Sequence, residues 1–367
     1  MEDIIYWLWL TNLSGVGSVK VSKLLEYFKS PEMIWQAGKS ELQACIGING
    51  HIMEKLSNKN LDAAKKILHD TQRLEIDIVT INDLRYPELL KRTYDPPGIL
   101  YFKGKMPKAD VVSVAVVGAR KASIYGKNIA EKISSQLAER GICVVSGMAR
   151  GIDTYSHKGA LKAGGETVAI LGCGIDIVYP KENEELMYYI IKNGAVVSEY
   201  PPGTFPSQCN FPARNRIISG ITLGTIVVEA GERSGSLITA DFALEQGREV
   251  FAVPGNIDNY YSIGTNNLIK QGAKLVTCIE DIFEELPINP VQYYHTNNIE
   301  EDNSLLHLGL SDDETIIFAH MSGTPLHIDE LCRSVGFSVQ KIYSILTLLE
   351  MKGLIQQIPG KYFAKVG

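Results

Sequence analysis

The amino-acid sequence predicts an α/β protein built around a doubly wound, mainly parallel β-sheet. Between residues 111 and 277, short runs of β-branched and other apolar residues alternate with amphipathic helical segments. The runs are apolar at successive positions, as expected for strands that are buried on both faces. The chain of 367 residues, 45% of them hydrophobic and 21% charged, has the composition of a globular protein with a large core. This alternation favours parallel strands joined by right-handed helical crossovers.

The expected strands follow one another at regular spacing. They cover residues 111–117, 143–145, 167–171, 195–198, 225–228 and 249–253, with a further candidate at 275–277. Amphipathic helices are expected at 126–139 and 154–163 between them. We therefore expect a Rossmann-like core, together with its entry segment, over residues 79–285.

Residues 1–78 are expected to form a helical domain. One apolar segment ends at Gly15-Val16-Gly17, and Ser18 is placed to cap a second helix that runs to about Phe28. The two glycines are typical of a helix-hairpin-helix or SAM-like module, whose backbone N–H groups can hold a phosphate. A plain helix–helix turn explains them equally well and is preferred, because a lone G-x-G carries little information. A turn-rich stretch with Pro96-Pro97 and Gly104 then connects to the core.

The C-terminal part of the chain is expected to be a separate small domain. Residues 286–310 are polar and acidic, without lysine or arginine, and are expected to form a linker. In residues 311–367, helices are expected at 312–321, 328–335 and 338–351, and Ser338 is the expected N-cap of the third. A hairpin that turns at Pro359-Gly360 is expected to follow. Three helices followed by a hairpin are the plan of a winged helix.

Composition excludes several classes of function. The net charge of −6 argues against a protein that coats nucleic acid by bulk electrostatics, although it leaves room for a local basic cleft. Six cysteines without a C-x-x-C pair indicate neither a zinc site nor a disulfide framework. No apolar run approaches the roughly 18 residues of a membrane span, and the acidic start Met1-Glu2-Asp3 is unlike a signal peptide. We expect a protein of the reducing cytoplasm, with no membrane partner, metal or cofactor.

Candidate ligand-binding residues gather in loops that follow the expected strands. In a doubly wound sheet, ligands bind outside the carboxyl ends of the strands. The loop residues that we expect to bind a ligand there are Arg120, Lys121, Ser146, Gly147, Arg150, Gly151, Phe211, Arg214, Asn215, Arg216, Arg233, Ser234, Gly235 and Ser236. Glycine lets the backbone approach a ligand, helix N-termini offer N–H groups to an anion, and arginine binds phosphate in a bidentate manner. Ordinary turns and local ion pairs would explain any single loop, but several such loops on one edge favour a phosphate-rich ligand.

Known catalytic and nucleotide motifs are missing from these loops. Gly118 is followed by Arg120 where a dinucleotide fingerprint needs a second glycine, and Gly126-Lys127 lacks the rest of a Walker loop. Ser234 is not in a G-x-S-x-G context, and His157 is expected to pack or cap a helix rather than to act as a base. The residues therefore favour binding over catalysis.

The loops also carry a family resemblance. The stretches that carry it are Ser146-Gly-Met-Ala-Arg-Gly-Ile-Asp153, Phe211-Pro-Ala-Arg-Asn-Arg-Ile217, Arg233-Ser-Gly-Ser-Leu-Ile-Thr-Ala240, Ala252-Val-Pro-Gly255, Gly264-Thr-Asn-Asn-Leu-Ile269 and Asp95-Pro-Pro97. They resemble the DNA-processing protein A family (DprA, also called Smf), densely over residues 80–285. Some members carry a lysine shortly before the motif F-P-x-R-N-R, but residues 207–210 of this chain contain none. The missing lysine implies either weaker DNA binding or compensation by Lys121.

The resemblance implies a cytoplasmic protein that binds and protects single-stranded DNA in natural transformation and helps to load the recombinase RecA. It further implies a homodimer with no known enzymatic activity, a DNA contact by Arg120, and a pocket lined by Arg214 and Arg216. Phe211 and Tyr125 could stack on bases, although packing is preferred for Tyr125.

Two further expectations concern the winged helix and an alternative function. Residues 311–367 hold five basic and six acidic residues, and the third helix offers only Lys341 and Lys352, so we expect protein contacts there rather than duplex binding. The alternative is a nucleotide-processing enzyme similar to the lysine-decarboxylase-like phosphoribohydrolases. It would use Glu229. However, residues 220–229 match only the second half of the motif P-G-G-x-G-T-x-x-E that those enzymes carry.

Overall fold

The structure is a computed structural model, and it describes residues 2–45, 50–286, 311–319, 321, 326–328, 331, 335, 337, 339–358 and 360–365. The chain divides into two compact units, residues 1–296 and 297–367. Among the helices of the described residues, none combines the length and the apolar character needed to cross a bilayer.

The first unit opens with short helices. They are α1 (Glu2–Thr11), α2 (Ser18–Phe28), α3 (Pro31–Gln36), α4 (Lys39–Ala44), α5 (Gly50–Ser57) and α6 (Asp62–Arg73). Their apolar side chains, among them Trp7 and Leu24, share one core cluster with Tyr101 and Ile190 of the part that follows. The glycine turn before α2 has Gly15 at φ +85° and Gly17 as an N-cap without a side-chain hydrogen bond.

A nine-stranded sheet follows the helices. Its strands are β1 (Asp77–Thr80), β2 (Ile99–Gly104), β3 (Ser113–Val117), β4 (Cys143–Ser146), β5 (Thr167–Leu171), β6 (Gly194–Ser198), β7 (Gly224–Val227), β8 (Glu249–Ala252) and β9 (Lys274–Leu275). The order across the sheet is β1-β2-β6-β5-β4-β3-β7-β8-β9. All neighbours from β6 to β9 pair in parallel, and the expectation of a doubly wound, mainly parallel sheet is confirmed.

The connecting stretch is more regular than the sequence suggested. Residues 86–104 were expected to be turn-rich, but β2 within them pairs antiparallel with β1 and with β6. The four residues Ile99-Leu-Tyr-Phe102 are all buried, which is the property of a strand in the sheet interior. Pro97 and Gly104 therefore bound this strand rather than replace it. The domain boundary expected after residue 78 falls inside β1.

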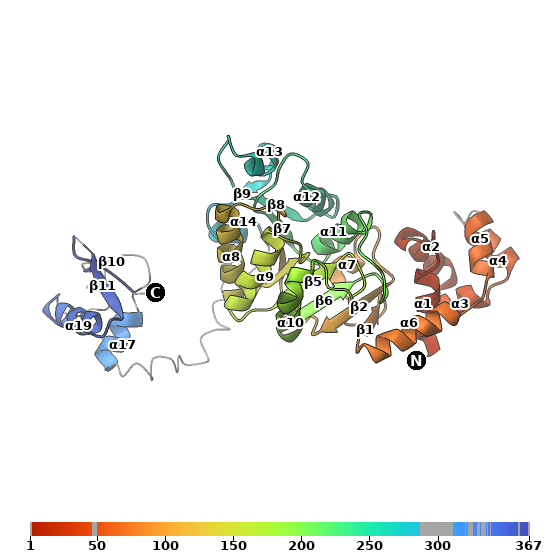
Figure 1. Ribbon diagram of the computed structural model, residues 1–367, viewed down its shortest axis with the longest axis horizontal. Coiled ribbons are helices and arrows are strands. Elements are labelled where there is room, and N and C mark those ends of the chain that lie inside the picture. Colours follow the sequence, from red (N-terminus) through yellow and green to blue (C-terminus); the bar gives the residue numbers. More distant parts are fainter. Residues whose placement is uncertain are drawn as a thin grey trace. The chain divides into compact units, whose positions relative to one another are not determined.

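Helices cover both faces of the sheet (Figure 1). They are α7 (Glu88–Lys91), α8 (Ile124–Glu139), α9 (Ile152–Lys162), α10 (Glu184–Asn193), α11 (Asn210–Gly220), α12 (Gly235–Glu245), α13 (Ile263–Lys270) and α14 (Glu280–Glu285), with the short 3-10 helices η1 (Lys181–Asn183) and η2 (Tyr260–Ser262). Side chains of α8, α9 and α14 form one core cluster against the sheet, and those of α11, α12 and α13 form another.

The strand order reverses beside β3. The chain moves from β3 through β4 and β5 to β6 in one direction, and then crosses back to place β7 on the other side of β3. At such a switch point the loops after the two neighbouring strands leave in opposite directions and open a crevice. Here these are the loops after β3 and β7.

The second unit has the elements of a winged helix. It contains α17 (Asp312–Ala319), β10 (Leu326–His327), α19 (Val339–Met351), β11 (Ile355–Ile358) and β12 (Tyr362–Lys365), with the sheet order β10-β12-β11. Ile317, Ile342, Leu346 and Phe363 lie in its core. Several expected features lie outside the described residues. They are the linker except for Leu286, most of the helix 328–335, the N-cap Ser338 and the turn residue Pro359.

Candidate functional site

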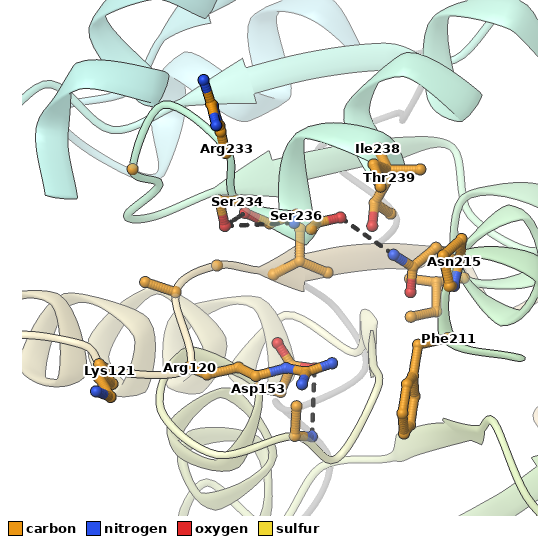
Figure 2. A pocket seen from close by; sticks show the side chains of 18 of the residues that line it. Arg120, Lys121, Asp153, Phe211, Asn215, Arg233, Ser234, Ser236, Ile238 and Thr239 are labelled. Atoms are coloured by element: carbon orange, nitrogen blue, oxygen red, sulfur yellow. Dashed lines mark hydrogen bonds between the residues drawn. The ribbon is translucent and has the colours of Figure 1, made fainter. Parts of the chain in front are cut away.

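A pocket of about 680 Å³ opens at the switch point between β3 and β7. Most of the residues that line it come from the loop after β3, the loop after β7, the first turns of α12, helix α11 and the segment around η2. In Figure 2, the Arg120 side chain extends toward Phe211, and Ser234 and Ser236 lie above it. Several of the loops that were expected to bind a ligand therefore border a cavity at this edge of the sheet.

Arg120 is held by a rigid loop. The N–H of Ala119 donates to the carbonyl of Glu229 (2.7 Å), and the N–H of Ile152 donates to the carbonyl of Ala119 (3.2 Å). Gly151 has φ +74°, and a Cβ there would collide with the carbonyl of Ala119, so this close approach requires glycine. The exposed Arg120 side chain reaches across the pocket, with its guanidinium carbon 5.1 Å from the centre of the Phe211 ring (Figure 2).

Phe211 is the centre of an aromatic wall. Its ring stacks on Tyr179, with ring centres 5.6 Å apart and planes inclined by 29°. On the other side of the opening, Tyr260 is 58% exposed and lines the same pocket. Aromatic faces beside a cation can hold an unpaired base by stacking and the adjacent phosphate by charge.

Arg214 is buried behind this wall and has a structural role. Its guanidinium donates to the carbonyls of Gly147 (2.7 Å) and Ile170, which ties the loop after β4 to the end of β5. Asp153 lies nearby and accepts from the N–H groups of Gly147 (3.2 Å) and Ala149 (3.3 Å). Burial raises the pKa of Asp153, a change that the nearby Arg214 partly offsets, and burial lowers the pKa of Arg214. Both side chains still line the pocket.

The N-terminus of α12 opens on the same pocket. Ser234 is its N-cap and accepts from the N–H of Ser236 at 3.4 Å, while the two hydroxyls lie 2.8 Å apart. Asn215 of α11 donates to the carbonyl of Gly235 at 3.2 Å, which fixes the two helices to each other. The free N–H groups at the start of this helix of 11 residues favour an anion. Arg233 lies at the rim of the pocket (Figure 2).

The structure brings most of the predicted residues together. Those that line this pocket are Arg120, Lys121, Phe211, Arg214, Asn215, Arg233, Ser234, Gly235 and Ser236. Gly147 and Arg150 instead border a small neighbouring pocket that shares Arg120 and Phe211 with it. Arg150 is exposed and forms an ion pair with Glu182 (Nη2 to Oε2, 3.0 Å). Gly151 packs against the backbone of the loop that carries Arg120.

Two predicted residues are corrected by the structure. Ser146 is fully buried, and its hydroxyl donates to the carbonyl of Val116 at 2.7 Å, so it holds β4 against β3 and cannot reach a ligand. Arg216 does not line the pocket. Its side chain is 8% exposed and forms ion pairs with Asp95 and Glu199, because it leaves α11 on the side opposite to the pocket.

Sequence reasoning missed several aromatic and polar residues of the site. Tyr179, Gln208, Tyr260 and Tyr261 all line the pocket. A signal was present for the tyrosine pair, since it follows the glycine turn after β8 and therefore lies at the same sheet edge. Tyr125, for which packing was preferred, is 53% exposed and lies outside the pocket lining.

Glu229 cannot serve the alternative enzymatic function. It is 2% exposed, and its carboxylate accepts from the N–H of Ser123 (2.9 Å) and from the Ser123 hydroxyl. This places the carboxylate under the first turn of α8 and outside the pocket lining. His157, expected to pack, is fully buried, with its Nδ1 2.7 Å from the Thr167 hydroxyl.

The fold and the site define a class of protein: a Rossmann-like α/β protein with a cationic, aromatic pocket at the switch point, joined to a winged helix. Comparison with known families narrows this class. A family model described as DNA recombination-mediator protein A matches residues 77–287, and one described as DprA winged helix domain matches residues 306–361. The chain therefore belongs to the DNA processing protein A (DprA) family.

Individual relatives agree with the assignment. The chain is 46% identical over 219 residues to the DNA processing protein DprA of Bacillus subtilis, covering 59% of this chain and 74% of that protein. It is 34% identical over 374 residues to protein Smf of Escherichia coli, covering 99% and 96% of the two chains.

Two solved structures are similar as well. That of DNA processing protein A from Streptococcus pneumoniae has 38% identity and a TM-score of 0.62, over 78% of this chain and 98% of that one. That of DNA processing protein A from Helicobacter pylori, described for its single-stranded DNA binding mode, has 29% identity and a TM-score of 0.52, over 57% and 94%.

Proposed function

We propose that this chain binds single-stranded DNA in the pocket between β3 and β7 and acts there as a recombination mediator. The observation that carries the proposal is the placement of Arg120. Its guanidinium lies over the Phe211 ring and, within the described part of the chain, forms no ion pair with an acidic residue. A positioned cation without a salt-bridge partner among the described residues, beside the N-terminus of α12, favours a phosphate ligand.

The aromatic wall favours a single strand over a duplex. In a duplex the base faces are stacked on one another, whereas a single strand can present them to Phe211, Tyr179 and Tyr260. Stacking on an aromatic ring is worth about 1–3 kcal/mol per base and tolerates any sequence. The relative from Helicobacter pylori, which is described for its single-stranded DNA binding mode, supports this choice.

The proposal extends to the cellular role. We infer that the chain protects incoming DNA during natural transformation, helps to load the RecA recombinase, works as a homodimer and acts in the cytoplasm without a cofactor. Membership of the recombination-mediator family supports this role. The sheet edge near Leu275 is a candidate for the dimer contact, and the Leu275 side chain is 41% exposed.

The first test is the binding of a labelled oligonucleotide, single-stranded and duplex, followed by fluorescence anisotropy across a salt series. We expect the wild type to prefer the single strand. The Arg120→Ala variant should bind it at least tenfold more weakly, because it loses a charge-assisted phosphate contact. The slope of log K against log salt should fall by about 0.7, the value for one phosphate on a single strand.

Lys162→Ala is the matched control. Lys162 is the last residue of α9, at the opposite end of that helix from the Arg120 loop, and it pairs with Glu131 at the surface. The Lys162→Ala substitution removes one positive charge without touching the pocket. The affinity of this variant for the single strand should stay within about twofold of that of the wild type. Equal losses in the two variants would show that bulk charge, not this pocket, binds the strand.

A further inference from the structure

All three nitrogens of the Arg216 guanidinium make partly buried contacts away from the pocket. Its Nε lies 3.3 Å from Oδ2 of Asp95, and its Nη1 donates to the Asp95 carbonyl at 2.6 Å. Its Nη2 donates to the carboxylate of Glu199 and lies 3.3 Å from the Ser18 hydroxyl. The planar fork of arginine suits such a set of partners, and lysine cannot reproduce it.

The partners of Arg216 come from three separate parts of the chain. Ser18 is the first residue of α2 in the helical N-terminal region, and Glu199 follows β6. Asp95 belongs to the segment before β2, whose Gly98 packs so closely against Trp7 and Thr11 that a Cβ there would meet both side chains within 3.3 Å. Arg216 is therefore the point at which the N-terminal helices, the entry segment and the sheet meet.

The same helix carries the wall of the pocket. Phe211 and Asn215 line the pocket from α11 and precede Arg216 by five residues and one residue, respectively. An α-helix transmits a shift or rotation of one turn to the next, because its backbone hydrogen bonds keep the turns in register. The contacts of Arg216 are therefore placed to influence how α11 presents Phe211 beside Arg120.

We propose that Arg216 is a positioning residue for the single-stranded DNA site, which holds α11 in its binding geometry by clamping it to Asp95, Glu199 and the start of α2. The proposal rests on the proposed function for its DNA readout. It makes the N-terminal helical region part of the machinery of the site without requiring that this region touch DNA. It also replaces the expectation that Arg216 contacts the strand itself.

Substitution of Glu199 distinguishes a positioning role of Arg216 from direct contact between Arg216 and the strand. Replacing a carboxylate by a neutral amide removes negative charge near an anion-binding pocket, and this change alone strengthens DNA binding. If Glu199 instead anchors Arg216, then Glu199→Gln loosens α11 and weakens binding. We expect Glu199→Gln and Asp95→Asn to weaken binding of a labelled single strand about threefold to thirtyfold, the range of coupling through residues that do not touch the ligand.

Salt dependence and a conservative variant complete the binding test. Glu199→Gln should leave the slope of log K against log salt unchanged, because no phosphate contact is lost. Arg216→Lys should weaken binding as much as Glu199→Gln does, also with an unchanged slope. Stronger or unaltered binding by Glu199→Gln overturns the proposal, as does near-wild-type binding by Arg216→Lys together with a slope reduced by about 0.7 in Arg216→Ala.

Hydrogen exchange of the full chain without DNA provides an independent readout. We expect Glu199→Gln and the milder Ser18→Ala to speed amide exchange in α11 and in the first turn of α2, while the central strands β3, β4 and β5 keep their protection. Unchanged exchange in both helices refutes the clamp. If wild type and Arg120→Ala bind the oligonucleotide equally, the proposed function fails, and the exchange experiment still decides whether Arg216 positions α11.

Discussion

At the scale of single residues, the buried surroundings of His157 determine its tautomer and its protonation state. The Thr167 hydroxyl donates to the Val144 carbonyl at 2.7 Å, so it accepts the proton of Nδ1 of His157. That assigns the neutral tautomer with an unprotonated Nε2, which is buried and has no partner within the described residues. Burial lowers the pKa of His157 to about 3. The ring is therefore a neutral packing element rather than a base.

This depressed pKa predicts a loss of stability in acid. Between pH 6.5 and about 3 the unfolded chain binds a proton at His157 that the folded chain does not, so the free energy of unfolding falls as the pH falls through this window. His157→Asn keeps a donor for Thr167 and removes the titrating group. We expect urea denaturation to show that the wild type loses on the order of 2 kcal/mol more than the variant between pH 7 and pH 4.5. Parallel pH profiles for the two proteins would contradict this account.

At the scale of elements, the start of α8 is held by a neighbouring strand. Ser123 caps the helix by accepting from the N–H of Gly126 at 3.0 Å, and Glu229, which follows β7, accepts from Ser123 in turn. Gly126 packs directly on this carboxylate, which a Cβ would overlap. The loop after β7 and the helix after β3 are thereby joined beneath the pocket, because the Glu229 carbonyl also anchors the Arg120 loop.

Gly126→Ala should therefore reverse the usual preference for alanine. In an unobstructed helix this change stabilises by up to about 1 kcal/mol. Here the added methyl displaces Glu229, and we expect a loss of about 1–3 kcal/mol in the free energy of unfolding, measured by chemical denaturation. Gly50→Ala is the control, since nothing lies within 4 Å of a Cβ at the start of α5. Similar effects of the two substitutions would show that Glu229 moves aside at little cost.

At the scale of the whole molecule, the two lysines that the third helix of the winged helix was expected to offer are already paired with acidic residues. Lys341 lies 2.8 Å from a carboxylate oxygen of Asp313, and Lys352 lies 2.9 Å from one of Glu314. Each lysine is thus paired with an acidic residue of α17, within a segment whose net charge is already negative. These contacts favour a protein partner over the phosphate backbone.

A chain ending at residue 286 should bind DNA as the full chain does. We expect its affinities for single strand and duplex to stay within about threefold of the full chain, with equal salt slopes, because no phosphate contact is removed. Anisotropy with the two labelled oligonucleotides measures both quantities. A duplex slope that falls by two or more on truncation would assign the winged helix a direct role in duplex binding.

The sequence was informative where structure is local. Runs such as Val114–Val117 and Val168–Leu171 are apolar at every position, and this pattern is sufficient to place strands that are buried on both faces. Strand ends then locate the binding edge, because parallel strands all point their carboxyl ends the same way. Arg120 and the α12 N-terminus were found by this reasoning. The strand at Ile99–Gly104 was missed, because the neighbouring prolines are local signals of a turn while the pairing with β6 is not local.

The sequence by itself determined the doubly wound sheet, the edge of the sheet at which the pocket lies and the residue types gathered there. Only the tertiary structure decided which arginines remain available. Arg120 and Arg216 are alike in sequence terms, yet one lies over Phe211 in the pocket and the other is neutralised by Asp95, 121 positions away, and by Glu199. The physical reason is that availability depends on the partners a charge meets after folding, and those partners are brought together by chain crossovers that no local pattern records.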